Sequence, residues 1–158
     1  LELYWNILYN MQMNINFKQM TLADKDEVLQ MMKDFYSSDA VSTNGSLDIF
    51  ETDFNYCISE NPLLTGYIFE SKSQICGYAM IAQSFSTEYG KPCFLFEDLY
   101  LKQDFRDLGI IPKFLSFIES KHKDSIFKLE VEKENQHAIH VYKKQGFKEL
   151  PYYEMIKL

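Results

Sequence analysis

The stretch FLFEDLYLKQDFRDLGIIPKFLSFIE, residues 94–119, decides the fold of this chain. Its first part is nearly all apolar, which predicts a strand over residues 93–102 in the interior of a sheet. A short polar turn follows, and from Gly109 the apolar residues recur at helical spacing, which predicts a helix over 109–121. The first turn of a helix leaves N–H groups unpaired and partly positive. A strand that turns directly into a helix therefore creates a binding site for a phosphate group.

The elements on both sides of this stretch extend the strand-and-helix pattern. Thr21 followed by Asp24 is an acidic variant of the capping box and predicts a helix start, and Gly146 is a helix C-cap. The sequence predicts strands at 14–20, 63–71, 75–86 and 126–133, helices at 21–36, 47–60 and 136–146, and one or two closing strands in 147–158. This order predicts a mixed α/β domain whose central sheet is flanked by helices on both sides.

The length of 158 residues, with 46% hydrophobic residues, suits one domain with a substantial core. We expect that domain to span residues 13–158 and residues 1–12 to be an N-terminal appendage. The apolar opening segment lacks the basic region and cleavage site of a signal peptide. No later segment approaches the roughly 18 apolar residues of a membrane span, so no membrane partner is expected.

The chain has a net charge of −7 and no run of basic residues. A protein that binds nucleic acid normally has a basic stripe, so we expect no nucleic-acid partner. An acidic surface is compatible with a cationic small-molecule substrate, although it is also common in soluble proteins. The three cysteines form no C-x-x-C pair, so neither a disulfide framework nor a zinc site is expected. This cysteine usage favours a reducing compartment, and we predict a cytoplasmic location.

Two separated signatures resemble those of the GCN5-related N-acetyltransferase family. Arg106 and Gly109 match its acetyl-CoA loop, and the second signature contains Asn135, Ala138, Tyr142 and Gly146-Phe147. The resemblance covers nearly everything after Met13. It implies a central mixed sheet, acetyl-CoA as co-substrate, no metal, and direct transfer of an acetyl group to a primary amine. The Glu-Asp pair in FEDLYL resembles, more weakly, diamine and polyamine acetyltransferases.

The resemblance also implies which residues hold acetyl-CoA. Asn135 would contact the pantetheine arm, unless it serves only as a helix N-cap. The backbone around the turn and the free edge of the strand would bind the rest through Leu99, Tyr100, Leu101, Arg106, Asp107, Leu108, Gly109, Ile110 and Ile111. Ile111 stands where the family has glycine or alanine, and Pro112 removes one N–H group. We expect weakened rather than lost binding.

Acetyl transfer to an amine requires removal of a proton, because alkylamines have pKa values near 10. Glu97 lies two residues before Leu99 on the same strand face and is our candidate base or proton relay; the alternative is a structural salt bridge. Asp98 is assigned to structure or substrate contact. Tyr142 matches the family's general acid, which would protonate the thiolate; the alternative is an aromatic packed on the sheet.

Three other residues have chemically reactive side chains but lack the partners that a site requires. His137 and His140 have a spacing that can bind a metal, but without a third ligand nearby we expect them to face solvent. Cys93 has no partnered base and is expected to be a buried hydrophobe.

The leading hypothesis is an N-acetyltransferase of a small polyamine-like amine. The alternatives are transfer to a peptide or protein amine or an aminoglycoside, a non-catalytic acyl-CoA-binding module, and an interaction domain without a cofactor. A homodimer is compatible with the family resemblance.

Overall fold

The computed structural model describes residues 14–158, so the predicted appendage at 1–12 lies outside the described residues. The elements, in chain order, are β1 (Ile15–Gln19), η1 (Leu22–Asp24), α2 (Lys25–Tyr36), α3 (Leu47–Cys57), β2 (Leu64–Ser71), β3 (Gln74–Ser86), β4 (Lys91–Leu101), η2 (Gln103–Phe105), α4 (Ile110–Lys121), β5 (Ile126–Leu129) and α5 (Gln136–Lys144). They match the predicted elements through residue 146, although the strand predicted for 126–133 ends at Leu129. Within this range no helix has the length and apolarity that crossing a membrane requires.

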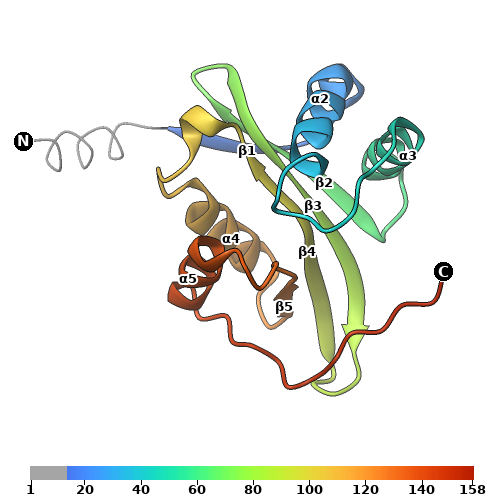
Figure 1. Ribbon diagram of the computed structural model, residues 1–158, viewed down its shortest axis with the longest axis vertical. Coiled ribbons are helices and arrows are strands. Elements are labelled where there is room, and N and C mark those ends of the chain that lie inside the picture. Colours follow the sequence, from blue (N-terminus) through green and yellow to red (C-terminus); the bar gives the residue numbers. More distant parts are fainter. Residues whose placement is uncertain (1–13) are drawn as a thin grey trace, which may run out of the picture.

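The five strands form one sheet in the order β1-β2-β3-β4-β5. All neighbouring strands are antiparallel except β4 and β5, which run parallel and are connected through α4. Helices α2 and α3 cover one face of the sheet, and α4 and α5 cover the other (Figure 1). Each face has its own hydrophobic core, one around Phe54 and Tyr78 and the other around Phe69, Phe96 and Phe114. The predicted mixed α/β fold is confirmed.

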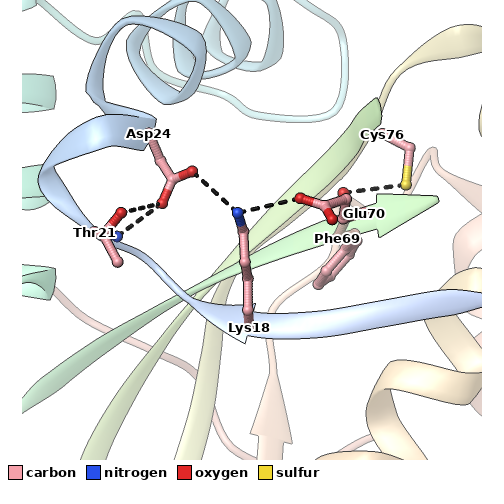
Figure 2. Close-up of polar contacts among 6 residues, drawn as sticks. All are labelled: Lys18, Thr21, Asp24, Phe69, Glu70 and Cys76. Carbon is pink, nitrogen blue, oxygen red and sulfur yellow. Dashed lines mark hydrogen bonds and ion pairs between the residues drawn. The ribbon is translucent and has the colours of Figure 1, made fainter. Parts of the chain in front are cut away.

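The predicted capping box is present where β1 passes into the first helical segment. The backbone N–H and the hydroxyl of Thr21 donate to Asp24 Oδ2 at 2.8 and 2.9 Å. Figure 2 shows Lys18 of β1 between the carboxylates of Asp24 and Glu70, at 3.6 and 3.1 Å. Because Asp24 is buried, this cation and the capping hydrogen bonds compensate for the loss of its hydration. The contacts fix where the strand ends and the helical segment begins.

Strand β4 contains a β-bulge at Glu97. Asp98 pairs with Met80 of β3 and Phe96 pairs with the next residue, Ile81, so Glu97 has no partner on β3. A bulge interrupts the alternation of side chains along a strand. Phe96 consequently packs in the core on the α4 side, whereas the Asp98 side chain faces α2 and bonds to Tyr36.

The prediction of closing strands in residues 147–158 is wrong. The structure assigns no strand there, and the segment passes the end of the β3–β4 hairpin (Figure 1), where the Tyr152 hydroxyl bonds to Glu88 at 3.3 Å. A strand needs a hydrogen-bonded neighbour, whatever its intrinsic propensity. β5 pairs only with β4. Residues 147–158 therefore form no hydrogen-bonded ladder with the sheet, although their composition favours a strand.

Candidate active site

The turn before α4 provides free backbone donors. Gly109 caps the helix with φ of 71°, and Asp107 also has a positive φ, of 61°. The first helical donor is Lys113, whose N–H bonds to the Gly109 carbonyl at 3.3 Å, so the N–H groups of Ile110 and Ile111 have no partner within the helix. These donors, with the positive end of the helix dipole, suit a phosphate group. A Cβ atom at Gly109 would meet nothing within 4 Å, so the turn is open.

The side chain of Ile111 packs against the core on the α4 face of the sheet, and its neighbour Ile110 is fully buried in that core. At least part of the branched side chain is therefore directed toward the sheet. Pro112 lies in the first turn, where its missing N–H disrupts no helical hydrogen bond. The expectation of weakened acetyl-CoA binding stays a prediction.

Charged side chains flank this turn. The Arg106 Nε donates to the Leu101 carbonyl at 3.1 Å, which ties the turn to the end of β4. The carboxylate of Asp107 lies 2.9 Å from Nε2 of His137, at the start of α5, and both side chains are exposed. His137 thus faces solvent as expected. Its contact with Asp107 was not predicted, because it links segments thirty positions apart in the sequence.

The edge of β4 beyond Phe96 is free on the side of β5. The parallel ladder runs from Cys93↔Ile126 to Phe96↔Leu129 and stops there. Residues 98–101, which include the predicted cofactor-binding Leu99, Tyr100 and Leu101, pair with β3 alone, and Glu97 pairs with neither neighbouring strand. Apart from the Leu101 carbonyl, which accepts from Arg106, the outward N–H and C=O groups of residues 98–101 are available to an extended ligand with amide groups.

A cavity of about 70 Å³ lies where the two strands part. It brings together predicted residues from distant parts of the chain: Glu97 and Leu99 of β4, Tyr142 of α5 and Asn135, which precedes α5. The remaining lining residues are Phe35, Ala40, Phe96, Leu129, Glu130, Val131 and Ala138. Arg106, Asp107, Leu108, Gly109, Ile110 and Ile111 do not line this cavity; they lie at the turn described above.

The predicted catalytic pair has suitable protonation states. Glu97 is exposed at the cavity and makes no ion pair within residues 14–158. Partial burial raises the pKa of its carboxyl, and the negative charges of Asp98, Glu154 and Asp53 raise it further, which makes the carboxylate a better base near neutral pH. Burial raises the pKa of Tyr142, so its hydroxyl keeps the proton that a general acid must donate.

Asp98 occupies a closed site of its own. Its side chain is 3% exposed, with Oδ1 accepting from the Tyr36 hydroxyl at 3.0 Å and Oδ2 from the Tyr78 hydroxyl at 2.8 Å. Burial raises the pKa of this carboxyl to about 6, and the tyrosine hydrogen bonds act against the shift. Because the side chain is enclosed, a substrate could contact Asp98 only if the surrounding side chains moved.

Asn135 caps α5, since its Oδ1 accepts from the Ala138 N–H at 3.2 Å. Its amide NH₂ is left for another partner in the cavity, so capping and a cofactor contact are compatible. Residues 14–158 contain no group of three or more His, Cys, Asp or Glu side chains placed to hold a metal. Cys93 is buried.

A second, larger hollow of about 550 Å³ lies between α2, α3 and the loop that joins them. Tyr36 and Phe50 line it together with Lys33 and Asn44. Tyr36 and Ser37 face this hollow, whereas Phe35 and Ala40 line the smaller cavity. The end of α2 therefore separates the two spaces.

A free strand edge beside an open helix N-terminus suits a long ligand that carries both amide and phosphate groups, as coenzyme A does. Fold and site together define an acyl-CoA-dependent transferase. A sequence model of the acetyltransferase (GNAT) family matches residues 26–147, so the chain belongs to that family. This confirms the prediction of an N-acetyltransferase that uses acetyl-CoA.

Solved structures of acetyltransferases share the fold at low sequence identity. A possible acetyltransferase from Clostridium difficile 630 has a TM-score of 0.74 and 16% identity, over 90% of this chain and 99% of that one. A predicted acetyltransferase with acetyl-CoA from Clostridium acetobutylicum has a TM-score of 0.73 and 20% identity, over 91% and 96%. An aminoglycoside N-acetyltransferase in complex with CoA has a TM-score of 0.74 and 14% identity, over 92% and 95%. No curated protein sequence matches the chain. The narrower resemblance to polyamine acetyltransferases finds no support among these structures.

Proposed function

We propose that the protein transfers the acetyl group of acetyl-CoA directly to a primary amine of a small polycationic molecule. The observation that carries this proposal is the concentration of carboxylates around the cavity. Glu130 lines it beside Glu97, and a hydrogen bond with Glu154, partial burial and the neighbouring negative charges raise the pKa of Glu130 to about 7. Carboxylates that raise one another's pKa also attract a positive charge.

The residues around the cavity can perform the proton transfers of this reaction. Acetyl-CoA supplies an activated thioester, whose carbonyl develops negative charge when the amine attacks. Glu97 accepts the proton of the amine, directly or through a water molecule. The free N–H groups of the β4 edge stabilise the negative charge on the carbonyl oxygen, and Tyr142 donates a proton to the departing thiolate.

The acceptor is either a polyamine-like molecule or an aminoglycoside, since both carry several amino groups. The polyamine candidate rests on the Glu-Asp pair of β4 and on the acidic surroundings of Glu97. The aminoglycoside candidate is supported by similar structures, one of which is an aminoglycoside acetyltransferase in complex with a bisubstrate analogue of CoA and acetylneamine. Loop 37–46, whose Ala40 lines the cavity together with Glu97, and loop 84–92 are the segments we expect to choose between them.

Calorimetric titration with acetyl-CoA and with desulfo-CoA tests the cofactor site first. Thiol release is then measured with putrescine, spermidine, neamine, kanamycin and a lysine peptide as acceptors. The proposal predicts micromolar binding of acetyl-CoA, turnover with at least one polycation, and loss of that turnover in Glu97→Gln. Turnover confined to the peptide would contradict the proposed acceptor class.

The second candidate is a non-catalytic acyl-CoA-binding module. Ile111 and Pro112 favour it, because they depart from the residues usual in the phosphate loop. It predicts binding of acetyl-CoA without thiol release for any acceptor. The cytoplasmic location and a homodimer remain our proposals for how the protein occurs in the cell.

A further inference from the structure

The buried carboxylate of Asp98 has no part in the proton transfers proposed above. It forms no ion pair with any residue of the described range 14–158. A buried carboxylate is costly unless hydrogen bonds replace its hydration, and here both bonds come from tyrosines. Tyr36 lies at the end of α2 and Tyr78 lies on β3. Asp98 is therefore a junction between a helix and two strands.

This junction is adjacent to the bulge that orients Glu97. The strand register advances by one residue between Phe96 and Asp98, which makes Glu97 the extra residue. Glu97 and Leu99 line the cavity, while Asp98 faces the opposite side of the sheet. Because two hydrogen bonds hold Asp98 on that side, β4 cannot rotate at the bulge without breaking them. The orientation of Glu97 into the cavity depends on the same bonds.

Asp98 also acts on Glu97 through its charge. It is the nearest in sequence of the negative groups that raise the pKa of Glu97. The titratable groups that face this region come from every element packed around it. They are Asp53 and Cys57 of α3, Tyr36 of α2, Tyr78 of β3, Tyr100 of β4, Tyr142 of α5, Glu130 after β5 and Glu154 in the C-terminal segment.

We infer that Asp98, held by Tyr36 and Tyr78, is a positioning residue for Glu97: it fixes the bulge that presents the Glu97 carboxylate to the acceptor amine. This inference rests on the proposed function, in which Glu97 accepts the proton. It gives Asp98 a role on the opposite side of the sheet from the substrate.

Tyr36→Phe removes one bond to Asp98 and keeps its charge, whereas Asp98→Asn removes the charge and keeps the shape. The control is Tyr67→Phe, which deletes the hydroxyl of a buried tyrosine on β2 whose partner is Lys121. Displacement of a reacting group lowers the rate steeply, so we expect kcat to fall about tenfold in both test variants, with KM for acetyl-CoA unchanged. In Asp98→Asn the acid limb of the pH profile of kcat/KM should also move to lower pH. Tyr67→Phe should change neither.

Carbon NMR of labelled glutamate carboxyls, with Glu97 assigned by its absence in Glu97→Gln, reads the same site without catalysis. We expect the pKa of Glu97 to be lower in Asp98→Asn than in the wild type. The inference is overturned if Tyr36→Phe and Asp98→Asn keep the wild-type kcat and pH profile and only lower the melting temperature, as Tyr67→Phe does. Asp98 would then have a structural role alone. If Glu97→Gln keeps wild-type turnover, the role of Glu97 in the proposed function fails instead, and the inference fails with it. If Asp98→Asn does not fold, Tyr36→Phe still decides through its kcat measured against an unchanged KM for acetyl-CoA.

Discussion

Tyr142 reaches the cavity from α5 and packs against Phe147, with the ring centroids 6.1 Å apart. A general acid contributes roughly 10²-fold or more to such a reaction. We therefore expect Tyr142→Phe to lower kcat about 100-fold, with little change in affinity for acetyl-CoA because the ring remains. Thiol release and calorimetry measure the two quantities. The control is Tyr152→Phe in the exposed C-terminal segment; wild-type turnover in Tyr142→Phe would remove this residue from the mechanism.

The carboxyl groups near the cavity make stability depend on pH. The pKa values of Asp98, about 6, and Glu130, about 7, lie above those of the unfolded chain, roughly 4. Between about pH 4 and 7 the folded protein thus binds more protons than the unfolded chain, and the free energy of unfolding falls as the pH rises through this window. Glu154→Gln removes the partner that contributes most to the shift of Glu130, so it should flatten this fall.

Urea unfolding between pH 4.5 and 8 measures this dependence. Glu149→Gln is the control, because the pKa of Glu149 is lowered by Lys143 and its loss should not flatten the fall. A free energy of unfolding that rises across the window, in the wild type, would contradict the assignment of raised pKa values.

Local residue patterns predicted the capping box of Thr21, because a cap involves residues three positions apart, and they offered an N-cap as the alternative role of Asn135. The environment of Asp98 could not be predicted in this way. Its two partners lie 62 and 20 residues away, and the bulge beside it depends on the pairing with β3. Simple alternation along β4 gives the correct side for Asp98 relative to Glu97, but it does not reveal that tyrosines enclose the carboxylate.

Most helices and strands were predictable because their signals are local. Gly146 follows α5 with φ of 91°, and the Phe147 N–H bonds back to the Tyr142 carbonyl, as its position after the apolar helix indicated. The prediction of strands in residues 147–158 is wrong because the apolar and aromatic residues that favour strands also occur where no neighbouring strand is available. The early end of β5 has the same cause: its ladder with β4 stops at the pair Phe96↔Leu129, so the residues after Leu129 have no pairing strand.

The turn from β4 into α4 requires a left-handed residue, which glycine adopts without strain. At Gly109 an added Cβ atom meets no other atom, so Gly109→Ala costs only the backbone strain of about 1–2 kcal/mol. Gly90 in the β3–β4 hairpin has φ of 64° and equally open surroundings, which makes Gly90→Ala a matched control. We expect both variants to lose similar stability in thermal unfolding, but only Gly109→Ala to bind acetyl-CoA more weakly by calorimetry. Equal affinity in the two variants would separate Gly109 from the phosphate site.

Across the whole molecule, the two faces of the sheet carry different tasks. The face under α4 and α5 contains the open turn, the free edge of β4 and Tyr142. The face under α2 and α3 holds Asp98 and the larger hollow. At the bulge, the hydrogen bonds of Asp98 on the face under α2 constrain the direction of the Glu97 side chain on the other face. A change at Tyr36 should therefore alter turnover while leaving the turn before α4 intact.

The C-terminal segment leaves large apolar side chains exposed, among them Leu150 at 54%, Met155 at 91% and Tyr153 at 96%. It lies in a molecule whose β5 edge pairs on one side only, and unpaired edges and apolar segments of this kind associate with other chains. We therefore expect a homodimer that covers this segment, detected by light scattering coupled to size-exclusion chromatography. Replacing Met155 and Ile156 with lysine should shift the mass to that of the monomer, whereas Leu22→Lys, at an exposed position beside α2, should leave the dimer intact. A monomeric wild type at micromolar concentration would contradict this expectation, and the exposed side chains would then have no partner copy.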